Sequence, residues 1–228
     1  GTNVVNIGAT LAPSVYFPGF IDDVRIYNRV LSASEIKALY QSGAAKFNIS
    51  PTKYLTNGLV GYWTMDGNKV NWATGAVTDS SGFGNTGTIT NMATSTGVSS
   101  GKLGQALNFD GVDDSINIAN TISNIQTVGF WVKATTTQKL IDLNGTASIE
   151  VINGTITANN FTATIYVDGI AASTIDTNWH YVTVTTGTGI SGSAITIGKI
   201  GTGFLNGILD DVRIYNRALS AKEVHQLY

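Results

Sequence analysis

One passage of the sequence occurs twice, and this repeat constrains the fold more than any other feature. "DDVRIYNRVLSASEIKALY" begins at Asp22, and "DDVRIYNRALSAKEVHQLY" begins at Asp210 and runs to Tyr228, the last of 228 residues. Roughly two thirds of the positions are identical across the repeated strand and helix. Such self-similarity indicates that the chain carries two copies of one structural unit.

The repeated unit reads as a strand, a turn and a short helix. "DDVRIYN" alternates between apolar and polar residues, which favours a strand. Ser32 with Glu35, and Ser220 with Glu223, have the spacing of a helix-capping box, and apolar residues at helical spacing follow each of them. Because the residues before each passage also match, each copy is expected to hold two strands and a terminal helix.

The repeat predicts three parts in the chain. Residues 1–40 are interpreted as the tail of a preceding module, residues 41–57 as a linker, and residues 58–228 as a complete module that ends in an equivalent tail. Two strands and one helical turn bury too little surface to fold alone. We therefore expect residues 1–40 to add their strands to a copy of the chain or to an upstream part of the parent protein. The alternative is an extra β-layer on residues 58–228.

The other segments predict an all-β fold. Clusters of Gly, Asn, Asp and Thr, which are turn residues, separate short runs that alternate between apolar and polar residues. These runs lie at residues 58–65, 127–134, 147–153, 161–169, 180–187 and 194–200. Many short strands at regular spacing favour a two-sheet antiparallel jelly-roll sandwich.

The composition excludes several classes of function. Charged residues make up 12% of the chain and Lys and Arg are dispersed, so no basic surface for nucleic acid is expected. The absence of cysteine excludes a disulfide framework and thiolate metal sites. No apolar run reaches the roughly 18 to 20 residues that a membrane-spanning helix needs, so membrane insertion is not expected.

The order of short motifs along the module resembles a known family. "GLVGYWTMDG", "DSSGFGNTGTI", "GKLGQALNFDGVDDSINI", "WHYVTVT" and "GILDDVRIYNRALSAKEV" follow one another between residues 58 and 228. In this order they are similar to the bacterial laminin-G-like domain of the concanavalin A-like lectin/glucanase superfamily. Residues 1–40 resemble only the C-terminal end of that domain. The resemblance implies two stacked antiparallel sheets, binding of carbohydrate or protein, and a place in large secreted proteins.

The acidic residues of the module do not predict a glycosidase. Retaining glycosidases need two carboxylates about 5 Å apart. The module has only two glutamates, Glu150 and Glu223, and Glu223 belongs to a capping box. The aspartate pairs at 113–114 and 210–211 are adjacent in sequence, so their side chains are expected to point to opposite faces of a strand. Both histidines are interpreted as structural, and we predict that the chain is not an enzyme.

A structural calcium ion is the cofactor that the sequence suggests. The resemblance implies that Asp210, on the last strand, is a ligand, and Asp66 and Asn85 are the further candidates. Strand alternation predicts that Asp210 shares a face with the core residue Val212, where a buried carboxylate is costly unless it is paired or bound to a metal. The alternative is that Asp210 caps a turn or pairs with Arg213, and that the Asp/Gly loops are ordinary turns.

The candidate for a sugar contact is Trp72. Trp63, Trp131 and Trp179 lie in alternating strands and are expected in the core, whereas Trp72 lies in the polar loop "DGNKVNWATGAVTD". An exposed aromatic ring in a loop can stack on a sugar, although a tryptophan folded back onto the sandwich is the alternative. The acidic segment "DGVDD" at 110–114 is interpreted as a turn between strands.

These observations predict a non-catalytic binding or adhesion module at the surface of, or outside, a bacterial cell. Its expected ligand is a glycan or another cell-surface group. The alternative from another class is a structural subunit of an extracellular filament or surface layer. Such a polymer would be assembled by strand exchange through residues 1–40, because a head-to-tail contact that does not close builds a fibre.

Overall fold

The computed structural model describes residue 7 and residues 24–32, 35–36 and 55–228. By its internal contacts the chain divides into two compact units, Gly1–Ser50 and Pro51–Tyr228. Most of the predicted tail and most of the predicted linker at 41–57 lie outside the described residues. The predicted domain boundaries therefore stay predictions.

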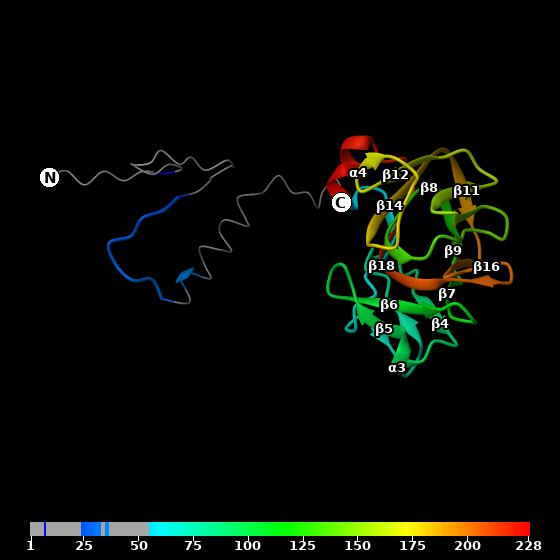
Figure 1. The fold of residues 1–228 in the computed structure, drawn as a ribbon, viewed down its shortest axis with the longest axis horizontal. Helices are drawn as coiled ribbons and strands as arrows, with labels where there is room; N and C mark the ends of the chain where they lie inside the picture. The colour runs from blue at the N-terminus through cyan, green and yellow to red at the C-terminus, as the bar shows by residue number, and fades with distance from the viewer. Residues whose placement is uncertain (1–6, 8–23, 33–34, 37–54) are drawn as a thin grey trace. The chain divides into compact units, whose positions relative to one another are not determined.

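The second unit is a sandwich of two eight-stranded sheets with a short two-stranded sheet beside them, and its strand pairs run antiparallel (Figure 1). The first sheet has the order β13-β12-β14-β8-β18-β6-β5, and β1 also pairs with β18. Its strands are β1 (Leu59–Trp63), β5 (Val98–Ser100), β6 (Gln105–Asp110), β8 (Ile122–Ala134), β12 (Thr164–Val167), β13 (Ile170–Ala171), β14 (His180–Gly192) and β18 (Asn206–Tyr215). The predicted all-β jelly roll is confirmed.

The second sheet has the order β11-β10-β9-β15-β7-β4-β3-β2. Its strands are β2 (Val70–Asn71), β3 (Ala76–Val77), β4 (Gly87–Thr90), β7 (Ser115–Ile118), β9 (Gln138–Asp142), β10 (Ser148–Ile152), β11 (Thr155–Asn159) and β15 (Ile195–Ile197). The two-stranded sheet consists of β16 (Lys199–Ile200) and β17 (Gly203–Phe204), and the helices are α3 (Thr94–Gly97) and α4 (Ala221–Leu227). The sequence did not predict α3, a single turn of the residues "TSTG".

The main core fills the space between the two large sheets. Alternating residues of the strands supply it, and Trp63, Phe109 and Phe130 are among its largest fully buried side chains. Burying a large apolar side chain stabilises a fold by about 1.5–3 kcal/mol. The indole Nε1 of Trp63 donates a hydrogen bond to the carbonyl oxygen of Asn85 at 2.9 Å, so its polar atom is also satisfied. The core position predicted for Trp63 is confirmed.

A second apolar cluster covers the other face of the first sheet, beneath α4. Trp131 lies on β8 between Phe130 and Val132, which both belong to the main core, so strand alternation turns Trp131 outward. The buried members of the cluster are Leu59, Trp131, Tyr181, Tyr215, Leu219, Val224 and Leu227. Trp131 and the partly buried Trp179 thus pack against a helix-covered face rather than between the sheets.

The helix α4 begins with the capping box that the sequence predicted. The Ser220 Oγ accepts a hydrogen bond from the Glu223 backbone N–H at 3.4 Å, and the Ser220 N–H donates to Glu223 Oε2 at 2.8 Å. Val224 and Leu227 face the second cluster. Figure 1 shows α4, in red, at the C-terminal end of the chain, and α4 contacts β13.

A β-bulge in β18 changes the predicted direction of Asp210. Asp210 pairs with Trp131 and Arg213 with Gly129, so three steps along β18 match two along β8. Asp211 takes up the extra residue with a φ of 56°. Asp210 therefore lies on the face of Trp131, not on the core face of Val212 as simple alternation predicts.

The described part of the first unit repeats the local structure of the second copy. The Glu35 carboxylate pairs with Arg29 at 2.6 Å, and its Oε2 accepts the Ser32 N–H at 2.9 Å. In the second copy Glu223 pairs with Arg217 at 2.7 Å and accepts the Ser220 N–H. The turn and the helix start are thus formed identically in both copies.

The two copies differ in burial. The described apolar side chains of the first copy are mostly exposed, and Ile26 is 73% exposed, whereas its counterpart Ile214 is fully buried. The exposed set is Val24, Ile26, Tyr27, Val30 and Ile36. Among the described residues, the same sequence is therefore buried in the second copy and mostly exposed in the first.

Candidate functional site

Asp66 and Asp210 both bind the loop that joins β5 to β6. The backbone N–H of Leu103 donates to Asp210 Oδ2 at 3.0 Å, and the N–H of Gln105 donates to Asp66 Oδ1 at 3.0 Å. One carboxylate follows β1 and the other lies on β18, so the loop connects the start of the module to its last strand. The structure brings together two of the three residues predicted to bind calcium.

The Asp210 side chain is fully buried, and only one of its two carboxylate oxygens accepts a described hydrogen bond. Its Oδ1 has no hydrogen-bond partner among the described residues. Burial raises the pKa of Asp210 to about 6, and the neighbouring charges of Asp211 and Asp66 add to that rise. A Cβ on Gly101 would lie 2.6 Å from Asp210 Oδ2, so bare backbone passes directly against the carboxylate. Two carboxylates beside glycine-rich backbone are the hard oxygen donors that calcium prefers, and the residues present fit such an ion.

Asn85 belongs to a different network. Its side-chain amide donates to the Val60 carbonyl oxygen at 2.7 Å, and its Oδ1 accepts from Asn120 at 3.3 Å. Its backbone N–H donates to Asp79 Oδ2 at 2.8 Å. Among the contacts described for residues 55–228, none joins Asn85 to Asp66 or Asp210.

The carboxylate of Asp79 organises the loop "DSSGFGN" at 79–85. Oδ1 accepts the N–H of Tyr62 at 2.9 Å and that of Ser81 at 2.8 Å, and Oδ2 accepts the Ser81 hydroxyl at 2.8 Å. Gly82 and Gly84 both have positive φ, at 90° and 75°. Between them Phe83 is 66% exposed. The loop is fastened to β1 and presents an aromatic ring to solvent.

Sequence reasoning missed Phe83. The oxygen donors of this segment indicate a metal-binding loop, whereas the glycines on both sides of Phe83 are the signal that its ring leaves the surface of the sandwich. Trp72, the predicted contact, is partly buried and packs against the main core. A Cβ on Gly97 would lie 3.1 Å from its ring and 2.8 Å from Met92 Sδ. The structure thus places Trp72 in the folded-back position that was its alternative.

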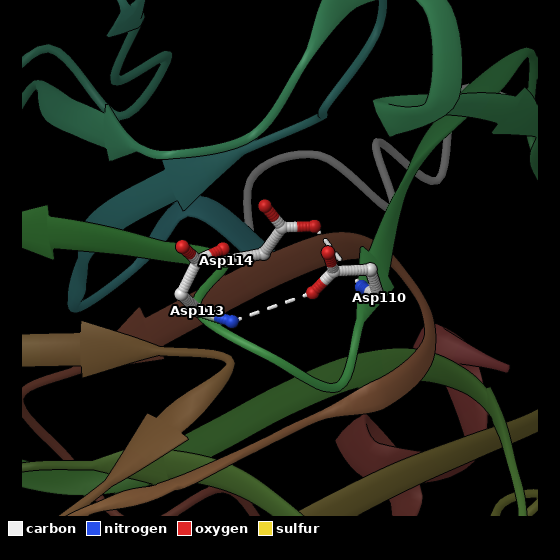
Figure 2. A group of neighbouring side chains, drawn as sticks. All are labelled: Asp110, Asp113 and Asp114. Carbon is white, nitrogen blue, oxygen red and sulfur yellow. Dashed lines mark hydrogen bonds between the residues drawn. The ribbon is translucent and has the colours of Figure 1, made fainter.

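The acidic segment at 110–114 forms the turn between β6 and β7 (Figure 2). Asp110 Oδ1 accepts the N–H of Val112 at 2.8 Å and that of Asp113 at 3.4 Å, while Asp114 Oδ2 accepts the Asp110 N–H at 3.0 Å. In the described part of the chain these three aspartates form the one group of three or more acidic or histidine side chains whose ligand atoms lie close enough to share an ion. Their contacts are those of a turn, as the sequence predicted.

An arginine and several tyrosines gather on the outer face of the first sheet. The Arg213 Nη2 donates to Asp211 Oδ2 at 2.7 Å and to the Tyr62 hydroxyl at 3.1 Å, and its guanidinium lies 4.6 Å from the centre of the Tyr62 ring. Asp211, rather than Asp210, is thus the partner of Arg213. Tyr215 is fully buried nearby, and burial raises its pKa to about 12.

The two glutamates of the module are engaged in ion pairs. Glu150 pairs with Lys139, and Glu223 pairs with Arg217, whose hydrogen bond together with the helix cap lowers the pKa of Glu223 to about 2. Neither is left as a raised-pKa acid of the kind a glycosidase uses as a proton donor.

The architecture defines a two-sheet jelly-roll module. The sequence matches the family described as "Concanavalin A-like lectin/glucanases superfamily" over residues 1–37 and 105–225. These stretches make up more than half of the chain, and the chain belongs to this laminin-G-like family. No curated protein sequence matches it. Within the described residues, no helix is both long and apolar enough to cross a membrane.

Solved structures share the fold at low sequence identity. Domain 4 of AbnA, a GH43 extracellular arabinanase from Geobacillus stearothermophilus, was determined in complex with arabinotriose. It is 19% identical with a TM-score of 0.52, and the match covers 74% of this chain and 97% of that domain. The binding domain of Paraclostridial Mosquitocidal Protein 1 is 15% identical with a TM-score of 0.53, covering 76% of this chain and 52% of that one.

A structure of botulinum neurotoxin type C, whose cell entry is described as dependent on two ganglioside molecules, is 12% identical with a TM-score of 0.50. The match covers 77% of this chain and 52% of the toxin chain. This chain therefore spans about half the length of the two toxin chains that it matches. At these identities the likeness shows the fold alone.

Proposed function

We propose that the second unit is a non-catalytic glycan-binding module of a larger extracellular bacterial protein. The observation that carries the proposal is the match to nearly the whole of AbnA domain 4, a separate domain of an enzyme that was determined with a bound arabinose trisaccharide. The ganglioside dependence of the botulinum neurotoxin supports the same class of ligand. Membership of a lectin and glucanase superfamily is consistent with both.

The glutamates of the second unit and its aspartates at 110–114 support binding rather than catalysis, because they take part in ion pairs or in the hydrogen bonds of a turn. Glu150 and Glu223 are ion-paired, and the aspartates at 110–114 are held in a turn. A retaining glycosidase needs a pair of carboxylates free to act as acid and nucleophile. Incubation with arabinan, galactan and glucan fragments is expected to release no reducing sugar, and steady hydrolysis would contradict this part of the proposal.

The direct test of the function is a glycan array probed with the full chain. Neutral plant and bacterial oligosaccharides and sialylated glycans are the probes, and at least one is expected to bind in a dose-dependent manner. A Trp72→Ala variant tests the contact predicted from the sequence. Because Trp72 packs against the core, unchanged binding by a folded variant would remove it as a contact. An array without any bound glycan would overturn the proposed function.

We further propose a structural calcium ion between Asp66 and Asp210. The orphaned Asp210 Oδ1 and the close approach of the Gly101 backbone support it. Asn85, the third ligand suggested by the sequence, already uses its amide elsewhere. Bound there, calcium would compensate the buried carboxylate and fasten the loop before β6 to the last strand.

The expected outcome is that calcium raises the Tm and that a chelator reverses the shift, because a ligand of the folded state stabilises it by mass action. Asp210→Asn should abolish the calcium-dependent shift. In chelator the same variant should unfold at a higher temperature than the parent, because it removes an uncompensated buried charge. A Tm that is the same in calcium and in chelator would contradict the site. Asp113→Asn, in the β6–β7 turn, is the control and should keep the shift.

A second candidate function, a subunit of a strand-exchanged polymer, is supported by the exposed first copy. Residues 24–32, 35 and 36 make the turn and helix-start contacts of the second copy, yet Ile26 and Ile36 are exposed where Ile214 and Val224 are fully buried. Several exposed apolar side chains within one short segment are typical of a surface that binds another protein. A laminin-G-like sandwich that lacks its last strand would bury them, whether it belongs to another copy or to an upstream module.

Light scattering during gel filtration tests exchange between copies. The full chain is expected to form concentration-dependent oligomers, and Ile26→Asp to be monomeric. Ile170→Asp, a change of similar exposure on β13, should behave like the parent. Monomers at every concentration would contradict exchange between copies. In that case, protection of residues 24–36 from proteolysis in an N-terminally extended parent protein tests the upstream module, and cleavage there would end the proposal.

A further inference from the structure

A cavity of about 350 Å³ lies on the outer face of the first sheet, between the loop at 79–85 and the C-terminal half of β18. Tyr62, Ser80, Ser81, Phe83, Arg213 and Tyr215 contribute to its lining, and Leu55, Thr56 and Leu59 complete it. Its volume lies at the lower end of the range for small-molecule sites. Asp66, Asp210 and Trp72 are not among its lining residues, whereas Asn85 ends the loop that forms one wall.

The wall formed by the loop is rigid. Four hydrogen bonds to the Asp79 carboxylate fix the backbone of Tyr62, Ser81 and Asn85 and the Ser81 hydroxyl. The Phe83 ring stands on this loop at 66% exposure. A large exposed ring on a fixed backbone loses little conformational entropy when it stacks on a ligand. Phe83 therefore has the properties of a stacking platform at the rim.

The floor of the cavity includes polar side-chain atoms that make no hydrogen bond among the described contacts. The described hydrogen bonds of Arg213 come from Nη2, which leaves Nε and Nη1 as donors. Tyr215 is fully buried and its hydroxyl has no partner among the described residues. Because that hydroxyl has almost no accessible surface, Tyr215 contributes its ring to the lining, and Arg213 is the source of donors that a ligand can reach. Ser80 adds an exposed hydroxyl at the mouth.

The charges favour an uncharged ligand. The guanidinium of Arg213 is paired with Asp211 at 2.7 Å, and the Asp79 carboxylate is surrounded by donors. The cavity thus offers hydrogen-bond donors and acceptors and an aromatic ring without an unpaired cation for an acidic group. Rings with apolar faces and hydroxyl edges meet these requirements.

We propose that this cavity is the glycan site of the module and that it takes a neutral sugar residue stacked on Phe83, with Arg213 donating to its hydroxyls. The proposal rests on the proposed glycan-binding function and adds to it a location and a class of sugar. It assigns binding to the loop at 79–85 rather than to the loop of Trp72.

The test is calorimetry with the strongest neutral oligosaccharide from the glycan array. Phe83→Ala is expected to weaken binding at least tenfold while leaving the Tm unchanged, because the ring is exposed and supports no core contact. Ile170→Ala is the matched control, since Ile170 is 64% exposed on β13 and outside the cavity, and it should bind like the parent. Ser80→Ala should weaken binding to a smaller extent.

The possible outcomes distinguish a wrong location for the site from a wrong function of the module. Glycan binding that survives Phe83→Ala keeps the proposed function and overturns this location. Equal losses in Phe83→Ala and Ile170→Ala also overturn it, because the loss would not be specific to the cavity. If the array binds only sialylated or other acidic glycans, the class of sugar is wrong. If it binds none, the proposed function itself fails.

Discussion

His180 connects two carboxylates at the start of β14. Its Nδ1 lies 2.8 Å from Asp168 Oδ2 and its Nε2 lies 3.0 Å from Asp176 Oδ1, while the other oxygen of Asp168 accepts the Tyr181 N–H. Burial lowers the pKa of His180, but the two carboxylates outweigh burial and the pKa is raised. The imidazolium thus fastens the segment between β13 and β14 to the first sheet.

A histidine with a raised folded-state pKa stabilises the fold in its protonated form. Its contribution is fully present below the unfolded pKa, near 6.5, and is lost as the pH rises through the folded value. His180→Gln should therefore lower the free energy of unfolding more at pH 5.5 than at pH 9, by a difference on the order of 1 kcal/mol. Urea titrations at both pH values measure it, with the exposed His225→Gln as control. An equal loss at both values would show that the charge of His180 contributes nothing.

Single residues also mark where sequence reasoning stops. Trp72 and Phe83 both lie in polar loops, and sequence alone favours the larger ring as a contact. Whether a loop ring folds back depends on neighbours that are distant in sequence, such as Met92 and Gly97 beside Trp72. Asp79, which fastens the loop of Phe83 to the Tyr62 backbone, acts through contacts that no spacing rule describes.

At the level of elements, the alternating runs predicted strands well because one face of each strand packs into a core. The sequence also predicted the capping box of α4, because the two residues that form it are three positions apart. The sequence did not predict the bulge in β18. It arises from the pairing of β18 with β8, so the direction of Asp210 followed from a partner strand rather than from its own sequence.

The two copies of the repeat allow one substitution to be compared in two environments. Val224 lies on α4 and is fully buried against the second cluster, whereas its counterpart Ile36 is exposed. Val224→Ala should destabilise the second unit by about 2 kcal/mol through lost burial and a residual cavity. Ile36→Ala should change the stability of a monomeric chain by less than about 0.5 kcal/mol. Urea denaturation measures both, and similar losses would mean that Ile36 is buried in solution.

At the level of the whole molecule, the two copies of the repeat are not equivalent. The second unit contains its own last strand, β18, within the first sheet, and its own helix, α4, which packs on the outer face of that sheet. The first copy has the same turn contacts, and its described apolar side chains are mostly exposed. The sequence predicts that the first copy adds its strands to another sandwich, and this stays a prediction.

The second unit should consequently fold without the first. The described members of its core and of its outer cluster all lie within residues 55–228, so we expect a fragment of residues 51–228 to keep the contacts among them. The fragment is expected to unfold in one transition with a Tm within about 2 °C of the corresponding transition in the full, monomeric chain, because changes at exposed surface alter stability by only a few tenths of a kcal/mol. Calorimetry of both proteins at low concentration measures this. A markedly lower Tm for the fragment would show that residues 1–50 pack on the second unit as an additional layer, and the proposed exchange with another sandwich would then lose its basis.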